Sequence, residues 1–222
     1  MGKAKHDPAE AFRQLTDPDA GTRLLGAKWL LRQSLAEMNR WTDEWLRHPD
    51  TVTALLPALA DSDERVVEEA VGAAWGIATR YNRDARLRAP AISLLSSGRP
   101  RTRQRAAVIV SRFGAESFGY LLPLFSDPDK SVRAGVAHDV MHACHDWPEA
   151  TRQQVRTAAL ALLGDRVFEV RCSAADLLRD VGEIDDLPAL EVSLAGIKGV
   201  NYRQSFREAM QAIQDSRTKR CT

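Results

Sequence analysis

Three of the five histidines in this 222-residue chain lie within one short segment. His138 and His142 are four residues apart and would share one face of a helix, with His145 following them. Asp139, Cys144 and Asp146 add possible ligands, and imidazole, thiolate and carboxylate groups are common donors to metal ions. A closed metal site also needs ligands from a second element, and the sequence has no matching cluster. We therefore interpret the histidines as surface or interface side chains, keep a metal site as the alternative, and assign no cofactor.

A second candidate is a block of arginines. The block consists of Arg80, Arg83, Arg86, Arg88, Arg99, Arg101, Arg103, Arg105 and Arg112, and Asp84 is the only acid among them. The chain as a whole has a net charge of only +1, so the positive charge is local. Such a block attracts either an acidic protein surface or phosphate, unless neighbouring acids neutralise it. The acids one repeat earlier are Asp61, Asp63, Glu64, Glu68 and Glu69. The low total charge makes nucleic acid less favoured than an acidic protein partner.

The positions of these residues follow from a repeated spacing. The anchors of the repeat are Asp17, Asp61, Ser97, Asp127 and Asp165. Six residues after each anchor come Arg23, Val67, Arg103, Arg133 and Arg171, and four further on come Ala27, Val71, Ala107, Ala137 and Ala175. Periods of roughly 30–47 residues are typical of stacked helix pairs. We expect each anchor to lie in the turn between two helices and to accept hydrogen bonds there and from the neighbouring repeat.

This spacing and helical apolar periodicity predict twelve helices. Their ranges are 8–16, 20–38, 51–60, 64–80, 83–96, 100–113, 116–125, 130–145, 148–163, 167–181, 185–196 and 201–214. An additional segment at 39–47 lengthens the first repeat, and we expect Trp41 and Trp45 to pack inward there. We predict a single repeat domain over residues 1–214, followed by a basic, frayed tail over 215–222.

Two segments resemble the HEAT-repeat family. These are Leu-Leu-Pro-Leu-Phe-Ser-Asp-Pro-Asp-Lys-Ser-Val-Arg-Ala at 121–134 and Ala-Leu-Leu-Gly-Asp-Arg-Val-Phe-Glu-Val-Arg-Cys-Ser-Ala-Ala at 161–175. Both have an Asp in the turn and a Val-Arg pair at the start of the second helix. The resemblance implies an all-α fold, an α-solenoid with a right-handed superhelix of five to six HEAT-like helix pairs. The fold serves scaffolds, inhibitors, transport factors and a few enzymes, so the resemblance specifies architecture more than function.

In such arrays the second helices usually line the inner surface. Offsets of two, five and nine residues from the Arg position should lie on that exposed face. They select Leu25, Lys28, Arg32, Glu69, Gly72, Gly76, Arg105, Val108, Arg112, Gly135, His138, His142, Ser173, Asp176 and Asp180. Trp29 and Trp75 flank the face as possible anchors, with core packing as their alternative. We predict partner binding by Lys28, Trp29, Arg32, Glu69, Trp75, Arg105, Arg112, His138, His142 and Asp176. Their mixed charge favours a specific protein partner.

No catalytic motif occurs in the sequence, so we assign no catalytic residues. HEAT-like alkylpurine DNA glycosylases, the di-iron enzyme deoxyhypusine hydroxylase and the phycobilin lyases contain related repeats, but their motifs do not map onto this chain. We also expect no secretory signal, because the first six residues are followed by no apolar region, and no transmembrane helix, because no long apolar segment occurs. Cys144, Cys172 and Cys221 have no paired spacing. We therefore expect a cytoplasmic, bacterial, non-catalytic protein-binding scaffold or inhibitor, with a toxin-neutralising immunity protein as the concrete hypothesis. The alternatives are a nucleic-acid-binding protein and a HEAT-repeat metalloenzyme or lyase.

Overall fold

The computed structural model describes residues 8–35, 49–80, 84–195 and 200–220, and the regular secondary structure within these ranges is entirely helical. The chain forms two compact units, Met1–Phe113 (unit 1) and Gly114–Thr222 (unit 2). The fold is an α-solenoid, as the repeat spacing predicts. The predicted single domain over 1–214 stays a prediction, and Trp41 and Trp45 lie outside the described residues.

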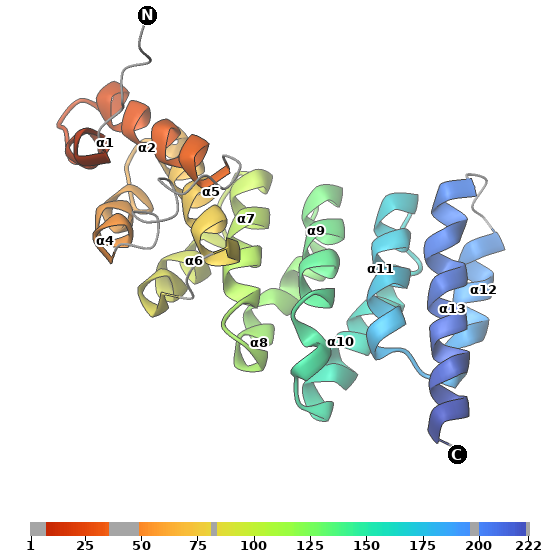
Figure 1. The fold of residues 1–222 in the computed structure, drawn as a ribbon. Coiled ribbons are helices and arrows are strands. Elements are labelled where there is room, and N and C mark those ends of the chain that lie inside the picture. Colours follow the sequence, from red (N-terminus) through yellow and green to blue (C-terminus); the bar gives the residue numbers. More distant parts are fainter. Residues whose placement is uncertain (1–7, 36–48, 81–83, 196–199, 221–222) are drawn as a thin grey trace, which may run out of the picture. The chain divides into compact units, whose positions relative to one another are not determined.

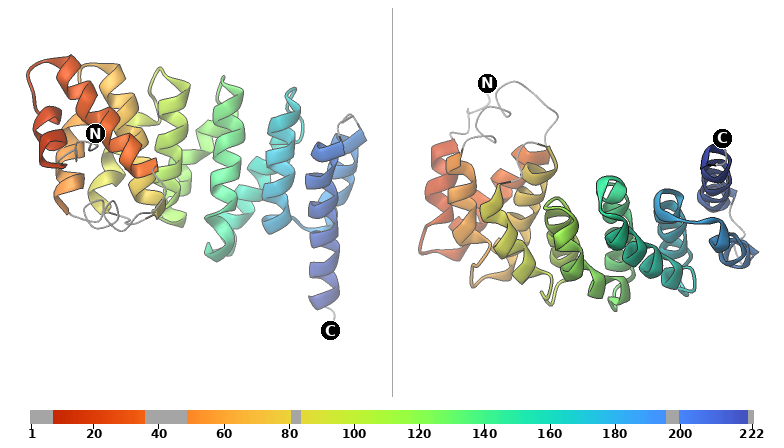
Figure 2. Two further views of the ribbon diagram at one scale, coloured as in Figure 1. Left: turned by 45° about the horizontal axis from the view of Figure 1, so that its top comes forward. Right: turned by 90° about the horizontal axis from the view of Figure 1, so that it is seen from below.

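Unit 1 is built from antiparallel helix pairs (Figure 1). The pairs are α1 (Pro8–Leu15) with α2 (Ala20–Leu35), α4 (Pro49–Ala58) with α5 (Glu64–Arg80), and α6 (Arg88–Leu94) with α7 (Pro100–Ser111). A 3-10 turn, η1 (Ala85–Leu87), precedes α6. The second helices α2, α5 and α7 contact one another in that order and form one layer, which we call the second-helix layer of unit 1 (Figure 2).

Unit 2 repeats this plan with a shorter first helix. Its first pair has η2 (Ala115–Ser117), α8 (Phe118–Leu121) and η3 (Leu122–Ser126) opposite α9 (Lys130–Met141), followed by η4 (Cys144–Asp146). The next pairs are α10 (Glu149–Leu162) with α11 (Phe168–Val181), and η5 (Ile184–Asp186) and α12 (Leu187–Ala195) with α13 (Val200–Arg220). Helix α11 contacts both α9 and α13, so these three form the second-helix layer of unit 2.

The anchors lie in the turns, as predicted, and each one fixes its turn by the same local bond. The side-chain oxygen of each anchor accepts from the backbone N–H two residues later. The bonds join Asp17 to Asp19 (2.8 Å), Asp61 to Asp63 (2.8 Å), Ser97 to Arg99 (3.3 Å), Asp127 to Asp129 (2.8 Å) and Asp165 to Val167 (2.8 Å). A carboxylate placed before a helix satisfies amides that have no partner within the helix.

The arginine six residues after an anchor ties the turn to the second helix. One guanidinium nitrogen, Nη1, donates to the carbonyl of the anchor in Arg23 (2.9 Å), Arg103 (2.7 Å), Arg133 (2.7 Å) and Arg171 (2.9 Å). The small residues four positions further on are all fully buried: Ala27, Val71, Ala107, Ala137 and Ala175. The repeat positions are therefore structural, as the spacing predicts.

Several element boundaries differ from the sequence prediction. The helix predicted at 130–145 ends at Met141, and the α-helix predicted over 83–96 begins only at Arg88. The segment at 116–125 does not form one helix, because Pro123 lacks the N–H that would bond one turn back and Gly114 adopts a positive φ of 95° just before it. Helix α13 continues to Arg220 instead of ending at 214. The segment contains no glycine or proline, and Gln211 donates to Asp215 one turn later (2.8 Å), which supports the longer helix.

Candidate functional site

Part of the described arginine block is bound to acids of the preceding repeat. Arg99 contacts Glu64 (2.9 Å) and Glu68 (2.7 Å), and Arg101 also reaches Glu68 (3.4 Å). Arg86 pairs with Asp84 (2.7 Å) within its own turn. These contacts correspond to the neutralised face that the sequence left open as an alternative. Arg86, Arg99 and Arg101 are therefore not free cations.

Arg105 does not lie on an exposed face, contrary to its predicted position. The residue is 8% exposed, and its Nη1 donates to the backbone carbonyl of Glu68 (2.8 Å). Burial lowers the pKa of Arg105 from its ordinary value, and the nearby charge of Arg101 acts in the same direction. The side chain therefore joins α7 to α5 and has little surface to offer a partner.

Three further positions of the predicted face, Gly72, Gly76 and Val108, are also buried. A Cβ atom at Gly72 would lie 2.5 Å from Nη1 of Arg105, and one at Gly76 would lie 2.6 Å from the Ser34 hydroxyl. The glycines let α2 and α7 approach α5 so closely that neighbouring side chains cover this part of the face. Glu69, Trp75 and Arg112 remain half-buried at its edges.

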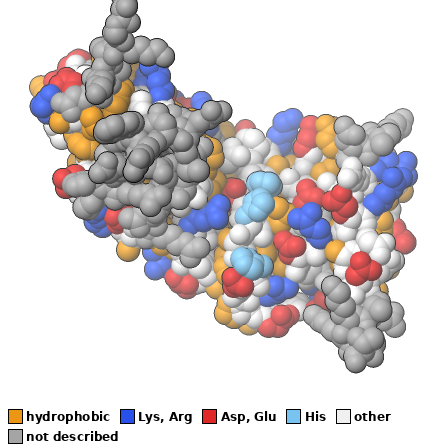
Figure 3. Space-filling model, in the orientation of Figure 1, with side chains coloured by type: hydrophobic (Ala, Val, Ile, Leu, Met, Phe, Trp, Pro, Cys, Tyr) orange, Lys and Arg blue, Asp and Glu red, His pale blue; other side chains and the backbone are white. Residues whose placement is uncertain are grey.

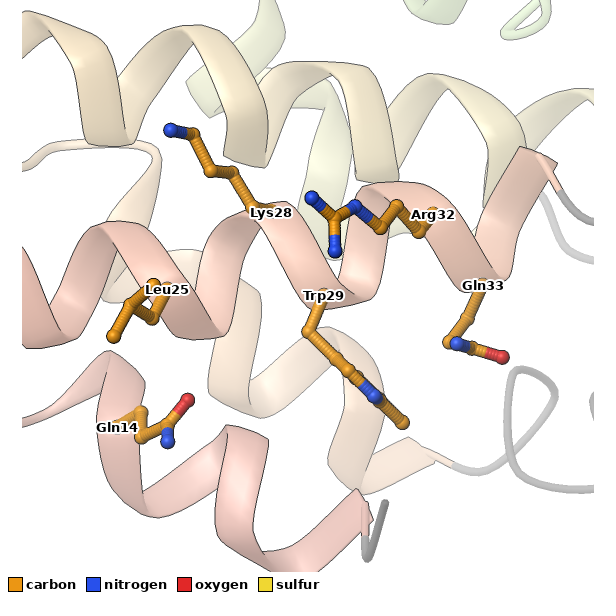
Figure 4. A pocket seen from close by; sticks show the side chains of 6 residues that line it. All are labelled: Gln14, Leu25, Lys28, Trp29, Arg32 and Gln33. Carbon is orange, nitrogen blue, oxygen red and sulfur yellow. The ribbon is translucent and has the colours of Figure 1, made fainter. Parts of the chain in front are cut away.

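Helix α2 has a pocket that combines apolar and cationic side chains. It has a volume of about 320 Å³ and is lined by Gln14, Leu25, Lys28, Trp29, Arg32 and Gln33. Lys28 and Arg32 lie on one side of α2, whereas Trp29 and Gln33 extend from the other side (Figure 4). Leu25 is 60% exposed, which is unusual for a large apolar side chain. We call this site the α2 pocket.

The cations of the α2 pocket are unpaired in the described part of the chain. Lys28 and Arg32 are exposed, and neither makes an ion pair or a hydrogen bond there. The other cation of α2, Arg23, binds the carboxylate of Asp61 with two nitrogens (2.5 and 3.0 Å). The α2 pocket therefore offers positive charge beside exposed apolar surface, which is suited to an acidic segment that also has apolar side chains.

In unit 2 the predicted residues gather on α9 and α11. The rings of His138 and His142 meet edge to face with their centroids 4.6 Å apart, and both residues are exposed. Figure 3 shows histidine side chains, in pale blue, at the molecular surface. Partial burial and the neighbouring His142 lower the pKa of His138, while Asp176 on α11 opposes this shift. The structure therefore brings together His138, His142 and Asp176 as one polar patch.

Among the residues that the structure describes, the alternative metal site has no complete ligand set. His145 lies in η4 and contacts Asp146 (2.8 Å). Over the described ranges, no group of three or more His, Cys, Asp and Glu side chains is arranged to hold a metal ion. The described helices also include none that is long and apolar enough to cross a membrane.

Much of the pocket lining was not predicted from the sequence. Gln14 and Gln33 line the α2 pocket. A second pocket of about 350 Å³ lies between the turn at 163–165 and α12, and none of its lining residues, which include Arg171 and Val192, was predicted to bind a partner. Val192 is 77% exposed. Helical periodicity could have identified Val192, because it is an apolar residue at an exposed helical position. No spacing rule selects Gln14 or Gln33.

Comparison with known proteins supports the fold. No family model matches the chain, and no curated protein is similar to it in sequence. Among solved structures, an engineered protein (target OR366) has a TM-score of 0.74 at 18% identity, over 94% of this chain and 99% of that one. A designed armadillo repeat protein has a TM-score of 0.70 at 16% identity, over 93% of this chain and 100% of that one.

A natural protein is also among the similar structures. One of them is a structure from work on a conserved phosphorylation switch, which controls the interaction between cadherin and β-catenin. It has a TM-score of 0.67 at 16% identity. The match covers 95% of this chain and 45% of that one. The chain is therefore a helical-repeat protein of the α-solenoid class. At these identities the likeness concerns the fold alone.

Proposed function

We propose that this protein is a non-catalytic scaffold, adaptor or inhibitor that binds an acidic segment of another protein through its second-helix layers. The α2 pocket is the observation that carries the proposal, because it places two unpaired cations beside exposed Leu25 and half-buried Trp29. Buried aromatic anchors with flanking arginines are typical of interface hot spots. The patch of His138, His142 and Asp176 is a second candidate contact area on unit 2.

The test uses a photo-reactive amino acid at Gln33 to cross-link the partner in cells of the native source. The cross-linked protein is then identified by mass spectrometry. We expect Lys28→Glu with Arg32→Glu to abolish the cross-link, because charge reversal repels an acidic segment. The matched control is Arg13→Glu, an exposed arginine on α1. An unchanged cross-link in the double variant would remove the α2 pocket as the binding site.

Nucleic acid is the second candidate, motivated by the arginine block. The observed pairing of Arg99 and Arg101 with glutamates removes part of that charge from contact with phosphate. We expect the purified protein to show no retention of duplex DNA at physiological salt. Retention with a steep dependence on salt concentration would favour nucleic acid over protein.

Within the protein-binding class, we propose a toxin-neutralising immunity protein as the specific role. The motivation is a repeat array whose candidate contacts differ in charge from helix to helix, which suits one particular partner. If the cross-linked partner is a toxin, adding this protein in equal amount should abolish its toxicity. A partner without toxic activity would refute this role and leave the binding proposal intact.

A further inference from the structure

Helix α12 has more apolar surface than its own repeat covers. Its sequence is Leu-Pro-Ala-Leu-Glu-Val-Ser-Leu-Ala, in which Glu191 is the only charged residue. Leu190 is fully buried, and the helix contacts α13 and η5 (Figure 1). Other apolar residues of α12 lie on a second face, which is exposed and follows the helical spacing. We call this surface the α12 face, and it consists of Pro188, Glu191, Val192 and Ala195.

The α12 face is acidic as well as apolar. Val192 is 77% exposed. Glu191 beside it is exposed and makes no ion pair or hydrogen bond within the described part of the chain. The segment 183–195 contains four acids and no lysine or arginine. Two of the acids bind Arg156 on α10 (3.0 and 2.7 Å), whereas Glu191 and Asp185 are exposed. The α12 face therefore combines negative charge with exposed apolar surface.

The exposed side of α2 has the complementary composition. Leu25, Lys28, Arg32 and Leu35 follow one another at helical spacing, and all four are exposed. The two cations lie at the centre of this stripe, and the two leucines, which are 60% and 43% exposed, lie at its ends. Figure 4 shows Lys28 and Arg32 extending from the same side of α2. Helix α2 therefore presents positive charge between apolar side chains.

Both faces are exposed in the same structure, so neither covers the other. The α12 face of one copy of the chain is therefore available to the α2 pocket of another copy. Two helices pack by placing the side chains of one between those of the other. In such a contact Glu191 reaches Lys28 or Arg32 while Val192 contacts Leu25. Opposite charges beside apolar contacts are the arrangement expected of a specific interface.

We propose that the α2 pocket of one copy binds the α12 face of a second copy. This inference rests on the proposed function, and it names one acidic, apolar segment that the α2 pocket accepts. The two surfaces differ, so the contact is head-to-tail and leaves a free α2 pocket at one end and a free α12 face at the other. A contact of two short helices buries less than the roughly 1,200 Å² of a stable complex, so we expect a dissociation constant on the order of 0.1 mM.

Sedimentation velocity of the purified full-length protein, from micromolar to millimolar concentration, measures this association. We expect the mean mass of the wild type to rise with concentration. Lys28→Glu with Arg32→Glu (the pocket variant) and Glu191→Arg (the face variant) should each weaken the association at least tenfold, because each places like charges opposite one another. The matched control is Glu116→Arg, which makes the same change of charge at an exposed acid of η2 and should change the affinity less than twofold.

An equal mixture of the two variants tests the pairing of the surfaces. The face variant keeps an intact α2 pocket, and the pocket variant keeps an intact α12 face. The mixture should therefore form one-to-one dimers with the affinity of the wild-type contact. Nothing larger should form, because the other two surfaces of that dimer are disabled. A contact between two α2 helices would not be restored by mixing.

A wild-type protein that stays monomeric at millimolar concentration would overturn the proposal. Association of either variant alone with the wild-type affinity, or the absence of dimers in the mixture, would overturn the pairing of α2 with α12.

The partner cross-linked at Gln33 in cells separates this result from the proposed function. If another protein is captured while the purified chain stays monomeric, only the self-association is refuted. If only second copies of the chain are captured, the self-association is supported and the binding of another protein is refuted. If nothing is captured and the purified chain stays monomeric, both are refuted.

Discussion

The guanidinium of Arg133 connects three parts of the chain: its own helix, the carbonyl of Asp127 and the carboxylate of Asp165. All three groups are largely buried, so each depends on the others for its hydrogen bonds. The charge of a surface pair such as Arg65 with Asp63 is instead screened by water. A buried arginine such as Arg133 and an exposed one such as Arg65 therefore contribute differently to the free energy of unfolding.

Arg133→Gln should lower the free energy of unfolding by about 2 kcal/mol, because it leaves the Asp165 carboxylate without its bidentate partner. Urea unfolding followed by circular dichroism measures the change. The control, Arg65→Gln, removes an exposed pair and should leave the urea midpoint unchanged. Equal midpoints for the two variants would contradict the structural role of Arg133.

The Asp165 carboxylate should make stability depend on pH. Burial raises the pKa of Asp165, but the hydrogen bonds from Arg133 and from the Val167 N–H outweigh it, so the net pKa is lowered. A lowered pKa in the folded state stabilises the protein above the unfolded value of about 3.9, and this contribution is lost as the pH falls through the folded pKa. In urea unfolding, Asp165→Asn should show a smaller loss of stability between pH 5 and pH 2.5 than the wild type. A parallel decline would show that this carboxylate is not involved.

His138 should titrate below the ordinary histidine pKa of about 6.5. Partial burial and His142 lower its pKa, and Asp176 raises it. Asp176→Asn should therefore lower the pKa further, and His142→Gln should raise it. Proton NMR of the imidazole Cε1–H resonance measures all three values. A pKa that stays the same in both variants would separate His138 from the patch.

At the scale of the helix, Gly76 on α5 determines how closely α2 approaches. A Cβ atom there would lie 2.7 Å from Cβ of Ser34 and 3.1 Å from its backbone oxygen. Gly119 on α8 is the opposite case, since a Cβ atom there meets nothing within 4 Å. The two glycines have the same intrinsic helix propensity and differ only in their surroundings.

Gly76→Ala should destabilise the protein by about 1–3 kcal/mol, because the backbone of α2 would have to shift. Gly119→Ala should be neutral or stabilise it by up to about 1 kcal/mol, because alanine is the better helix former. Thermal unfolding of the two variants gives the comparison. Stabilisation in both would show that the α2–α5 contact relaxes freely.

The elements could be predicted from the sequence because their signals are local. An anchor such as Asp61 lies two residues from the N–H that it caps, so spacing alone locates the turn. Exposure of the second helices could not be predicted in the same way. Whether position 105 is open depends on the distance between α5 and α7, and this distance depends on Gly72, which lies 33 positions earlier in the sequence.

At the scale of the molecule, the net charge of +1 hides a strongly uneven distribution of charge. Arg99 and Arg101 of the arginine block are paired with acids of the previous repeat, whereas Lys28, Arg32 and Arg171 have no carboxylate among the described residues. Composition and counts of charge could not separate these groups. The separation requires knowing which turns face each other.

Because each repeat contacts mainly its neighbours, a local defect should remain local. In Gly76→Ala we expect faster hydrogen exchange in α2 and α5, with the amides of α11 and α13 unchanged. Mass spectrometry of proteolytic fragments resolves these helices. Faster exchange throughout the chain would indicate a single cooperative unit instead.

The contacts of Arg23 with Asp61 and of Arg133 with Asp165 have a direction: the arginine always belongs to the earlier repeat and the carboxylate to the later one. A duplicated copy of such a repeat, inserted after its parent, would meet an arginine that already fits its aspartate. The repeat that originally followed the parent would then follow the copy, and its aspartate would bind the arginine of the copy. Arrays of this kind can thus lengthen or shorten by whole repeats during evolution without a new junction having to arise each time.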